Sequence, residues 1–149
     1  MTPFETAMDF VAQWEWGHRE DGALTDDPKD PGGLTKFGVA QRAHPDVDVA
    51  SLTLSQALEI YHREYWTVLN ADSLDLGMAI AAMDSTVNCG MSRTQEWLRI
   101  CSTWQSLCNA RSMYYLSLKM PRFEKGWLNR MNDLKKYITI VEQNAKINT

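Results

Sequence analysis

Apolar residues recur every three or four positions along most of this 149-residue chain, with polar residues between them. This spacing gathers the apolar side chains on one face of a helix and predicts amphipathic α-helices. The predicted helices cover residues 3–19, 54–68, 74–87, 92–100, 104–119 and 122–146. Nothing longer than a short β-hairpin, around Leu34–Val39, fits the alternating pattern of strands. The sequence therefore predicts a mostly α fold with an irregular loop or small β-hairpin after the first helix.

Residues that favour helix ends lie where this pattern needs them. Thr2 can cap the first helix and Pro3 suits its first turn. Thr53 and Gln56 have the spacing of a capping box. The stripe expected to be buried on that second helix consists of Leu54, Leu58, Tyr61, Tyr65 and Val68. The helix over 74–87 is apolar around much of its circumference, so we expect it at the centre of the fold.

Composition and charge narrow the class of protein. The length suits one domain, or two small lobes that share a core, which we place at residues 1–86 and 87–149. No apolar run reaches 18 residues, so no stable membrane insertion is expected, and the N-terminus does not resemble a secretory signal. The three cysteines have no metal-type spacing and fit buried thiols in a reducing compartment, although Cys101 and Cys108 could pair if their helices meet.

The net charge of −4 is unevenly distributed. Residues 1–86 carry 15 acidic and 5 basic side chains, whereas residues 87–149 carry 4 acidic and 10 basic ones. The basic part could face an anionic polymer, such as nucleic acid or bacterial wall, or could be an ordinary solvated surface. Because the overall charge is negative and no recognition motif is present, nucleic acid is not expected as a partner.

One carboxylate and one turn-forming segment are candidates for chemistry. Glu15 falls in the last turn of the first helix, between Trp14 and Trp16, where partial desolvation would favour its protonated form. The segment 26–33 is rich in Asp, Pro and Gly, a composition that breaks helices and builds ordered turns. It lacks the Asp-x-Asp-x-Asp-Gly spacing of a calcium loop, and the three histidines form no ligand cluster in sequence, so neither a metal nor a cofactor is expected. A helix-borne carboxylate followed by such a turn suits cleavage of a glycosidic bond.

These residues resemble a known signature. Glu15-Trp16-Gly17 and the run Asp27-Pro28-Lys29-Asp30-Pro31-Gly32-Gly33-Leu34-Thr35-Lys36-Phe37-Gly38-Val39 are similar to the motif of glycoside hydrolase family 108, N-acetylmuramidases found mainly as bacteriophage endolysins. The stretches 83–90 and 123–130 look like parts of the predicted peptidoglycan-binding region that follows in this family, shortened here. The resemblance implies a lysozyme-like fold, with the motif segment forming one wall of a groove.

The resemblance also implies roles for particular residues. The catalytic glutamate of the family falls on Glu15, as general acid. Asp30 and Thr35 are the candidates for the second catalytic group: Asp30 as nucleophile, transition-state stabiliser or base, and Thr35 as a hydroxyl that positions water. Asp30 could equally be a turn residue that satisfies backbone N–H groups. The candidate substrate-binding residues are Trp16, Phe37 and Asn88, although aromatic residues at such positions also commonly pack in a core.

The sequence thus predicts a monomeric enzyme that hydrolyses the β-1,4 bond between N-acetylmuramic acid and N-acetylglucosamine, with a peptidoglycan strand as its partner. As an endolysin it would stay in the host cytoplasm until it is released to the periplasm or cell wall. Two alternatives remain open. A lytic transglycosylase cuts the same bond with one glutamate and leaves a different product end, and a non-catalytic wall-binding module would not depend on Glu15.

Overall fold

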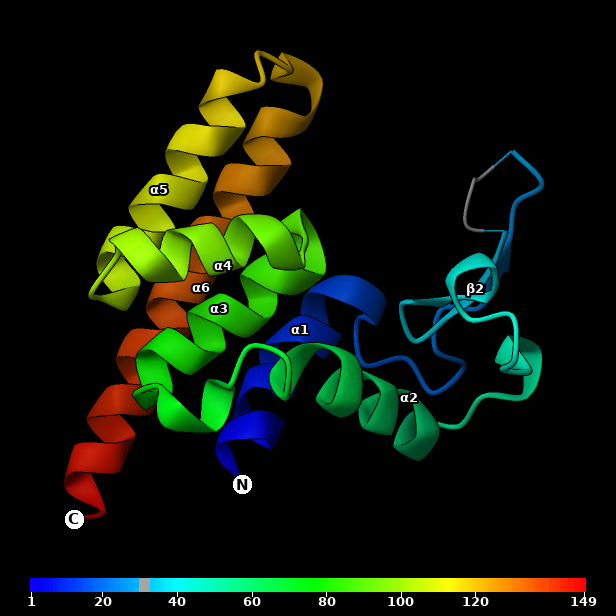
Figure 1. Ribbon diagram of the computed structural model, residues 1–149, viewed down its shortest axis with the longest axis horizontal. Helices are drawn as coiled ribbons and strands as arrows, with labels where there is room; N and C mark the ends of the chain where they lie inside the picture. The colour runs from blue at the N-terminus through cyan, green and yellow to red at the C-terminus, as the bar shows by residue number, and fades with distance from the viewer. Residues whose placement is uncertain (30–32) are drawn as a thin grey trace.

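The computed structural model describes residues 1–29 and 33–149 and shows helices around a central one, with a small sheet to one side (Figure 1). The α-helices are α1 (Pro3–Trp16), α2 (Leu54–Tyr61), α3 (Leu76–Cys89), α4 (Met91–Ile100), α5 (Trp104–Ser117) and α6 (Pro121–Ile147). The strands are β1 (Thr25–Asp26), β2 (Leu34–Lys36) and β3 (Val39–Ala40). Short 3-10 turns are η1 (Gln41–Ala43), η2 (Val49–Ser51) and η4 (Ala71–Ser73), and η3 (His62–Trp66) is a turn of π-helix.

Helix α3 lies at the centre, as its apolar sequence predicts. It packs against α1, α4, α5 and α6, and every residue from Gly77 to Thr86 is buried. A single cluster of buried side chains runs from α1 through α3 to α6. The lobe boundary predicted after residue 86 falls inside α3, so both predicted lobes build on the same helix.

The predicted helix starts are confirmed at both capping boxes. Thr2 Oγ1 accepts a hydrogen bond from the Glu5 backbone N–H at 3.1 Å, and the Glu5 carboxylate accepts one from Thr2. Thr53 and Gln56 make the same pair of bonds at the start of α2. These bonds satisfy backbone donors that the first helical turn leaves without partners.

Two details of the predicted second helix are wrong. Leu54 and Val68 are 46% and 53% exposed, although the helical spacing placed them on the buried stripe. Leu54 is the first residue of α2 and borders an apolar hollow between α1 and α2. Val68 follows the π-turn, whose extra residue rotates everything after it relative to an α-helical register.

Several other helix ends differ from the prediction. The first helix stops at Trp16 rather than 19, because Gly17 takes the left-handed conformation (φ 60°) and its N–H bonds to the Ala12 carbonyl. Helix α4 starts at Met91, directly after Gly90 and one residue before the predicted start. Helix α5 ends at Ser117 rather than 119, and Leu118, just beyond it, is exposed.

The sheet after α1 is antiparallel in the order β1-β2-β3, and it contains the predicted hairpin. Strands β2 and β3 pair Lys36 with Val39, so only Phe37 and Gly38 form the turn, and both have positive φ (50° and 73°). Positive φ at both central residues is the geometry that matches the twist of a two-residue hairpin. The three cysteines are free thiols, and among the described residues no helix is long and apolar enough to cross a membrane.

Candidate functional site

Glu15 lies in the last turn of α1, as predicted, and its side chain is 27% exposed. Its Oε1 atom accepts a hydrogen bond from Arg130 Nη1 on α6 at 2.9 Å. Within the described part of the chain, its second oxygen, Oε2, has no hydrogen-bond partner. The carboxyl group is therefore held at one oxygen and open at the other.

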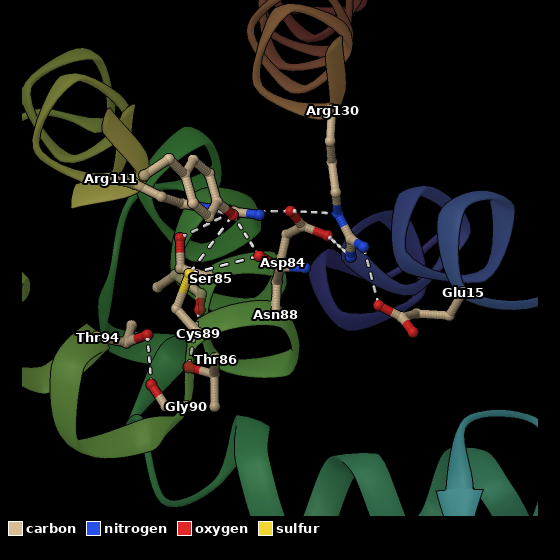
Figure 2. A network of polar contacts seen from close by, with 12 residues as sticks. Glu15, Asp84, Ser85, Thr86, Asn88, Cys89, Gly90, Thr94, Arg111 and Arg130 are labelled. Atoms are coloured by element: carbon tan, nitrogen blue, oxygen red, sulfur yellow. Dashed lines mark hydrogen bonds and ion pairs between the residues drawn. The ribbon is translucent and has the colours of Figure 1, made fainter. Parts of the chain in front are cut away.

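Arg130 joins Glu15 to a carboxylate buried in the centre of the protein (Figure 2). Its Nη2 and Nε atoms donate to Asp84 on α3 at 2.6 and 3.2 Å, and its guanidinium carbon lies 5.8 Å from the centre of the Trp14 ring. A planar guanidinium that binds one carboxylate with two donors and the other with a third has little freedom to rotate. Arg130 therefore fixes the direction of Glu15 with respect to α3.

Asp84 is fully buried and forms an ion pair with a second arginine. Arg111 Nη1 on α5 donates to Asp84 Oδ2 at 2.8 Å and to Ser85 Oγ at 3.1 Å, and Arg111 is itself fully buried. Burial pushes the pKa of Asp84 upward, but the charges of Arg111 and Arg130 outweigh it and hold the pKa below its usual value. Asp84 is thus ionised and its charge is balanced by two cations.

The polar network continues from Arg111 to the end of α3. Arg111 Nε donates to the Tyr115 hydroxyl at 2.8 Å, and that hydroxyl donates to Asn88 Oδ1. The Cys89 thiol lies 3.5 Å from the same hydroxyl. Asn88, a predicted substrate-binding residue, is therefore half-buried and engaged within the protein.

The β2–β3 turn also lies against Glu15. A Cβ atom placed on Gly38 would lie 4.0 Å from the Glu15 Cβ and would collide with the Tyr61 hydroxyl, which donates to the Phe37 carbonyl at 2.9 Å. Only a glycine allows this close approach at a positive φ. The motif residues Phe37 and Gly38 therefore bring the hairpin against the last turn of α1.

Of the two candidates for the second catalytic group, Thr35 lies among the described residues and Asp30 does not. Thr35 is half-buried in the middle of β2, paired with Thr25 and Ala40, and its hydroxyl is 3.5 Å from the Gly33 carbonyl. Asp30 lies outside the described residues. The hairpin that carries Thr35 contacts Glu15 at Gly38, and the roles of both candidates remain predictions.

Trp16 and Phe37, two of the predicted substrate-binding residues, are each only 4% exposed. Their rings meet edge to face with centroids 5.7 Å apart. The little surface they expose borders an apolar hollow of about 430 Å³ between α1 and α2, and Glu15 is not among the residues that line it. In this structure both rings act as core, and neither offers a free face beside Glu15.

Asp84, Arg111 and Arg130 are not among the site residues predicted from the sequence. The available signal was a charge within an apolar pattern: Asp84 follows a run of apolar residues in α3, and Arg130 lies beside Met131 on the buried stripe of α6. Charged side chains are almost never fully buried unless paired, so such positions indicate an internal ion pair. The stretches 83–90 and 123–130, read as wall-binding pieces, contribute Asp84 and Arg130 to this network.

The described residues show no group of three His, Cys, Asp or Glu side chains arranged to hold a metal ion. What they bring together is one partly exposed carboxyl group, fixed by an arginine and bordered by a glycine turn. Such a carboxyl group can exchange a proton with a bound substrate.

Comparisons with known proteins bear on both the sequence and the fold. The sequence profile of a family described as Glycosyl hydrolase 108 matches residues 8–90, which include both Glu15 and the hairpin. Among solved structures, that of Brucella abortus SagA is similar, with a TM-score of 0.69 and 24% sequence identity over 92% of this chain and 94% of that chain. This likeness confirms the predicted mostly α, lysozyme-like fold. No curated protein matches the chain.

Proposed function

Because the chain belongs to the glycosyl hydrolase 108 family and is a glycoside hydrolase, we propose that it is an N-acetylmuramidase of the endolysin type. Its substrate is the peptidoglycan glycan strand, and the bond cleaved is the β-1,4 bond between N-acetylmuramic acid and N-acetylglucosamine. It acts as a monomer without a cofactor. It remains in a host cytoplasm until release gives it access to the periplasm or wall.

The observation that carries this proposal is the setting of Glu15. The family signature supplies the carboxyl group, Arg130 holds its Oε1 atom, and the Gly38 turn borders it. The open oxygen Oε2 is the atom that carries the proton and delivers it to the glycosidic oxygen as the bond breaks. Arg130 keeps that oxygen aimed in one direction, which reduces the entropy lost on reaching the reactive geometry.

A carbohydrate that loses its leaving group develops positive charge at the sugar ring, and a second polar group must stabilise it or activate water. Thr35 and Asp30 are the proposed groups, one a hydroxyl and the other a carboxylate, and both lie within the part of the sequence that matches the family. A water positioned by Thr35 would attack the anomeric carbon of N-acetylmuramic acid as its bond to the glycosidic oxygen breaks, and Asp30 as base would take the proton of that water. The product would carry a reducing N-acetylmuramic acid end.

The direct test compares the wild type with Glu15→Gln on purified peptidoglycan, with products identified by mass spectrometry. Glutamine keeps an oxygen that can accept from Arg130 but cannot donate the acidic proton. Loss of a general acid lowers the rate by about 10²- to 10⁴-fold, and we expect reducing N-acetylmuramic acid ends to vanish accordingly. Glu20→Gln, at an exposed position five residues later, serves as the matched control and should behave as wild type.

Other products would change the assignment. Anhydro-muramic ends would identify a lytic transglycosylase, in which a hydroxyl of the sugar attacks and no second protein group is needed. Absence of glycan products from the wild type on several wall types would refute the enzyme proposal and favour a wall-binding module.

A further inference from the structure

The turn after α2 is wider than an α-helical turn. The Thr67 N–H donates to the His62 carbonyl at 2.9 Å, a bond across five residues, and His62–Trp66 form a single π-turn. Isolated π-turns insert one extra residue and recur at functional sites. Tyr65 lies in this turn, and its ring packs on Tyr61, whose hydroxyl reaches the Gly38 turn that borders Glu15.

The π-turn and the motif hairpin are joined at two points. Next to the turn, the Tyr61 hydroxyl donates to the Phe37 carbonyl at 2.9 Å. Within the turn, Glu64 Oε2 lies 2.8 Å from His44 Nε2, and His44 Nδ1 lies 3.1 Å from the Ala40 carbonyl at the end of β3. The hairpin therefore cannot shift relative to the π-turn without breaking these bonds, and Tyr65 is held at a fixed position beside it.

Tyr65 has the features of a ligand-binding aromatic residue. Its ring is half-buried and packs on the Tyr61 ring with centroids 5.5 Å apart, and its hydroxyl has no hydrogen-bond partner among the described residues. Burial, followed by the charges of Glu64 and Glu15, raises the pKa of the Tyr65 hydroxyl. The Tyr65 hydroxyl, which no described residue engages, belongs to a ring that packs on Tyr61 next to the Gly38 turn, and it is a free hydrogen-bond donor for a substrate.

We propose that Tyr65 is a substrate-binding residue near Glu15, where its hydroxyl and ring contact an amino-sugar unit of the glycan strand. This inference rests on the proposed function. It assigns to Tyr65 the contact that the sequence suggested for Trp16 and Phe37, whose rings are buried in the core. A tyrosine suits this role because it combines an apolar ring with a polar tip.

The test measures binding apart from catalysis. In the Glu15→Gln background, Tyr65→Phe and Tyr65→Ala are titrated by calorimetry with a purified tetrasaccharide of alternating N-acetylglucosamine and N-acetylmuramic acid. Loss of one hydrogen bond should raise the Kd of the Phe variant about 2- to 12-fold. Loss of the ring as well should raise it further in the Ala variant. In the wild-type background, Tyr65→Phe should raise KM by a similar factor and leave kcat within about twofold, since the bond is made with the bound substrate as well as the transition state.

Tyr114→Phe is the matched control, because Tyr114 is also half-buried but packs against Trp97 on the distant α4–α5 side. Its Kd should equal that of the Glu15→Gln parent. The inference is overturned if both Tyr65 variants, with wild-type circular dichroism, bind the tetrasaccharide as tightly as the parent. If the parent binds no tetrasaccharide and the wild type cleaves no peptidoglycan, the proposed function itself fails, and the role of Tyr65 fails with it.

Discussion

At the scale of single residues, the most consequential side chain is the fully buried carboxylate of Asp84. Asp84 holds Arg111 and Arg130 together, and through Arg130 it orients Glu15. Removing one member of a buried ion network leaves the others without compensation, which costs far more than losing a surface pair. Asp84 is therefore a positioning residue whose loss acts on both stability and site geometry.

We predict that Asp84→Asn lowers the free energy of unfolding by about 3–5 kcal/mol, since two buried arginines lose their counter-charge. Urea denaturation followed by circular dichroism measures this change. Asp133→Asn, an exposed position on α6, is the control and should stay within about 0.5 kcal/mol of wild type. A midpoint for Asp84→Asn equal to that of Asp133→Asn would contradict the structural role.

The same carboxylate predicts an acid dependence of stability. Because the pKa of Asp84 is lower in the folded than in the unfolded state, its contribution is complete above the unfolded pKa of about 3.9 and is lost as pH falls through the folded pKa. The melting temperature of the wild type should therefore fall more steeply below about pH 4 than that of Asp84→Asn. If the melting temperature falls with pH equally in the two proteins, the lowered pKa of Asp84 is contradicted.

At the scale of elements, the hairpin turn decides how closely the motif approaches the first helix. Phe37 and Gly38 both have positive φ, and the turn is held by the Tyr61 hydroxyl. The sequence indicates a hairpin here, but the requirement for glycine comes from Tyr61 and Glu15, which arrive from other elements.

We predict that replacing glycine by alanine has opposite effects on stability at Gly38 and at Gly126. Gly38→Ala should destabilise the fold by about 1–3 kcal/mol, since the new Cβ meets the Tyr61 hydroxyl at a strained φ, and it should reduce glycan cleavage. Gly126→Ala, in α6 with open space around its Cβ position, should stabilise by up to about 1 kcal/mol. Chemical denaturation of both variants checks the signs. The explanation is wrong if Gly38→Ala is neutral or stabilising.

At the scale of the whole molecule, the first 90 residues carry the family signature but do not complete the core. Helix α6 supplies the buried Arg130, Met131, Leu134 and Ile138, and Tyr137 donates to the Thr6 carbonyl of α1 at 2.8 Å. These contacts join the two ends of the chain. The basic C-terminal part therefore contributes to folding, whatever else its surface binds.

We predict that residues 1–90 expressed alone are unfolded, because α3 would expose the face that α5 and α6 cover. A chain that lacks only residues 146–149, all exposed, should retain the full fold. Circular dichroism and amide proton dispersion in NMR distinguish the two outcomes. A well-dispersed spectrum for residues 1–90 would establish an independent catalytic lobe and contradict the shared core.

The sequence by itself determined the helices, their caps, the short hairpin and the candidate Glu15. These features depend on neighbours within a few residues: apolar spacing, the Thr2 and Thr53 caps, and the Gly-rich run after residue 30. The signature around Glu15 also identified the family, because its residues are adjacent in the chain.

The tertiary structure alone decided which side chains surround Glu15. Arg130 is 115 residues away from it in sequence and Asp84 is 46 residues from Arg130, so no local pattern records their contact. Likewise, only packing shows that Trp16 and Phe37 are core while Tyr65 stays half-buried, because a ring's burial depends on what other elements cover it. Spacing along the chain determines elements, whereas the site is assembled from side chains that become neighbours only when the helices pack.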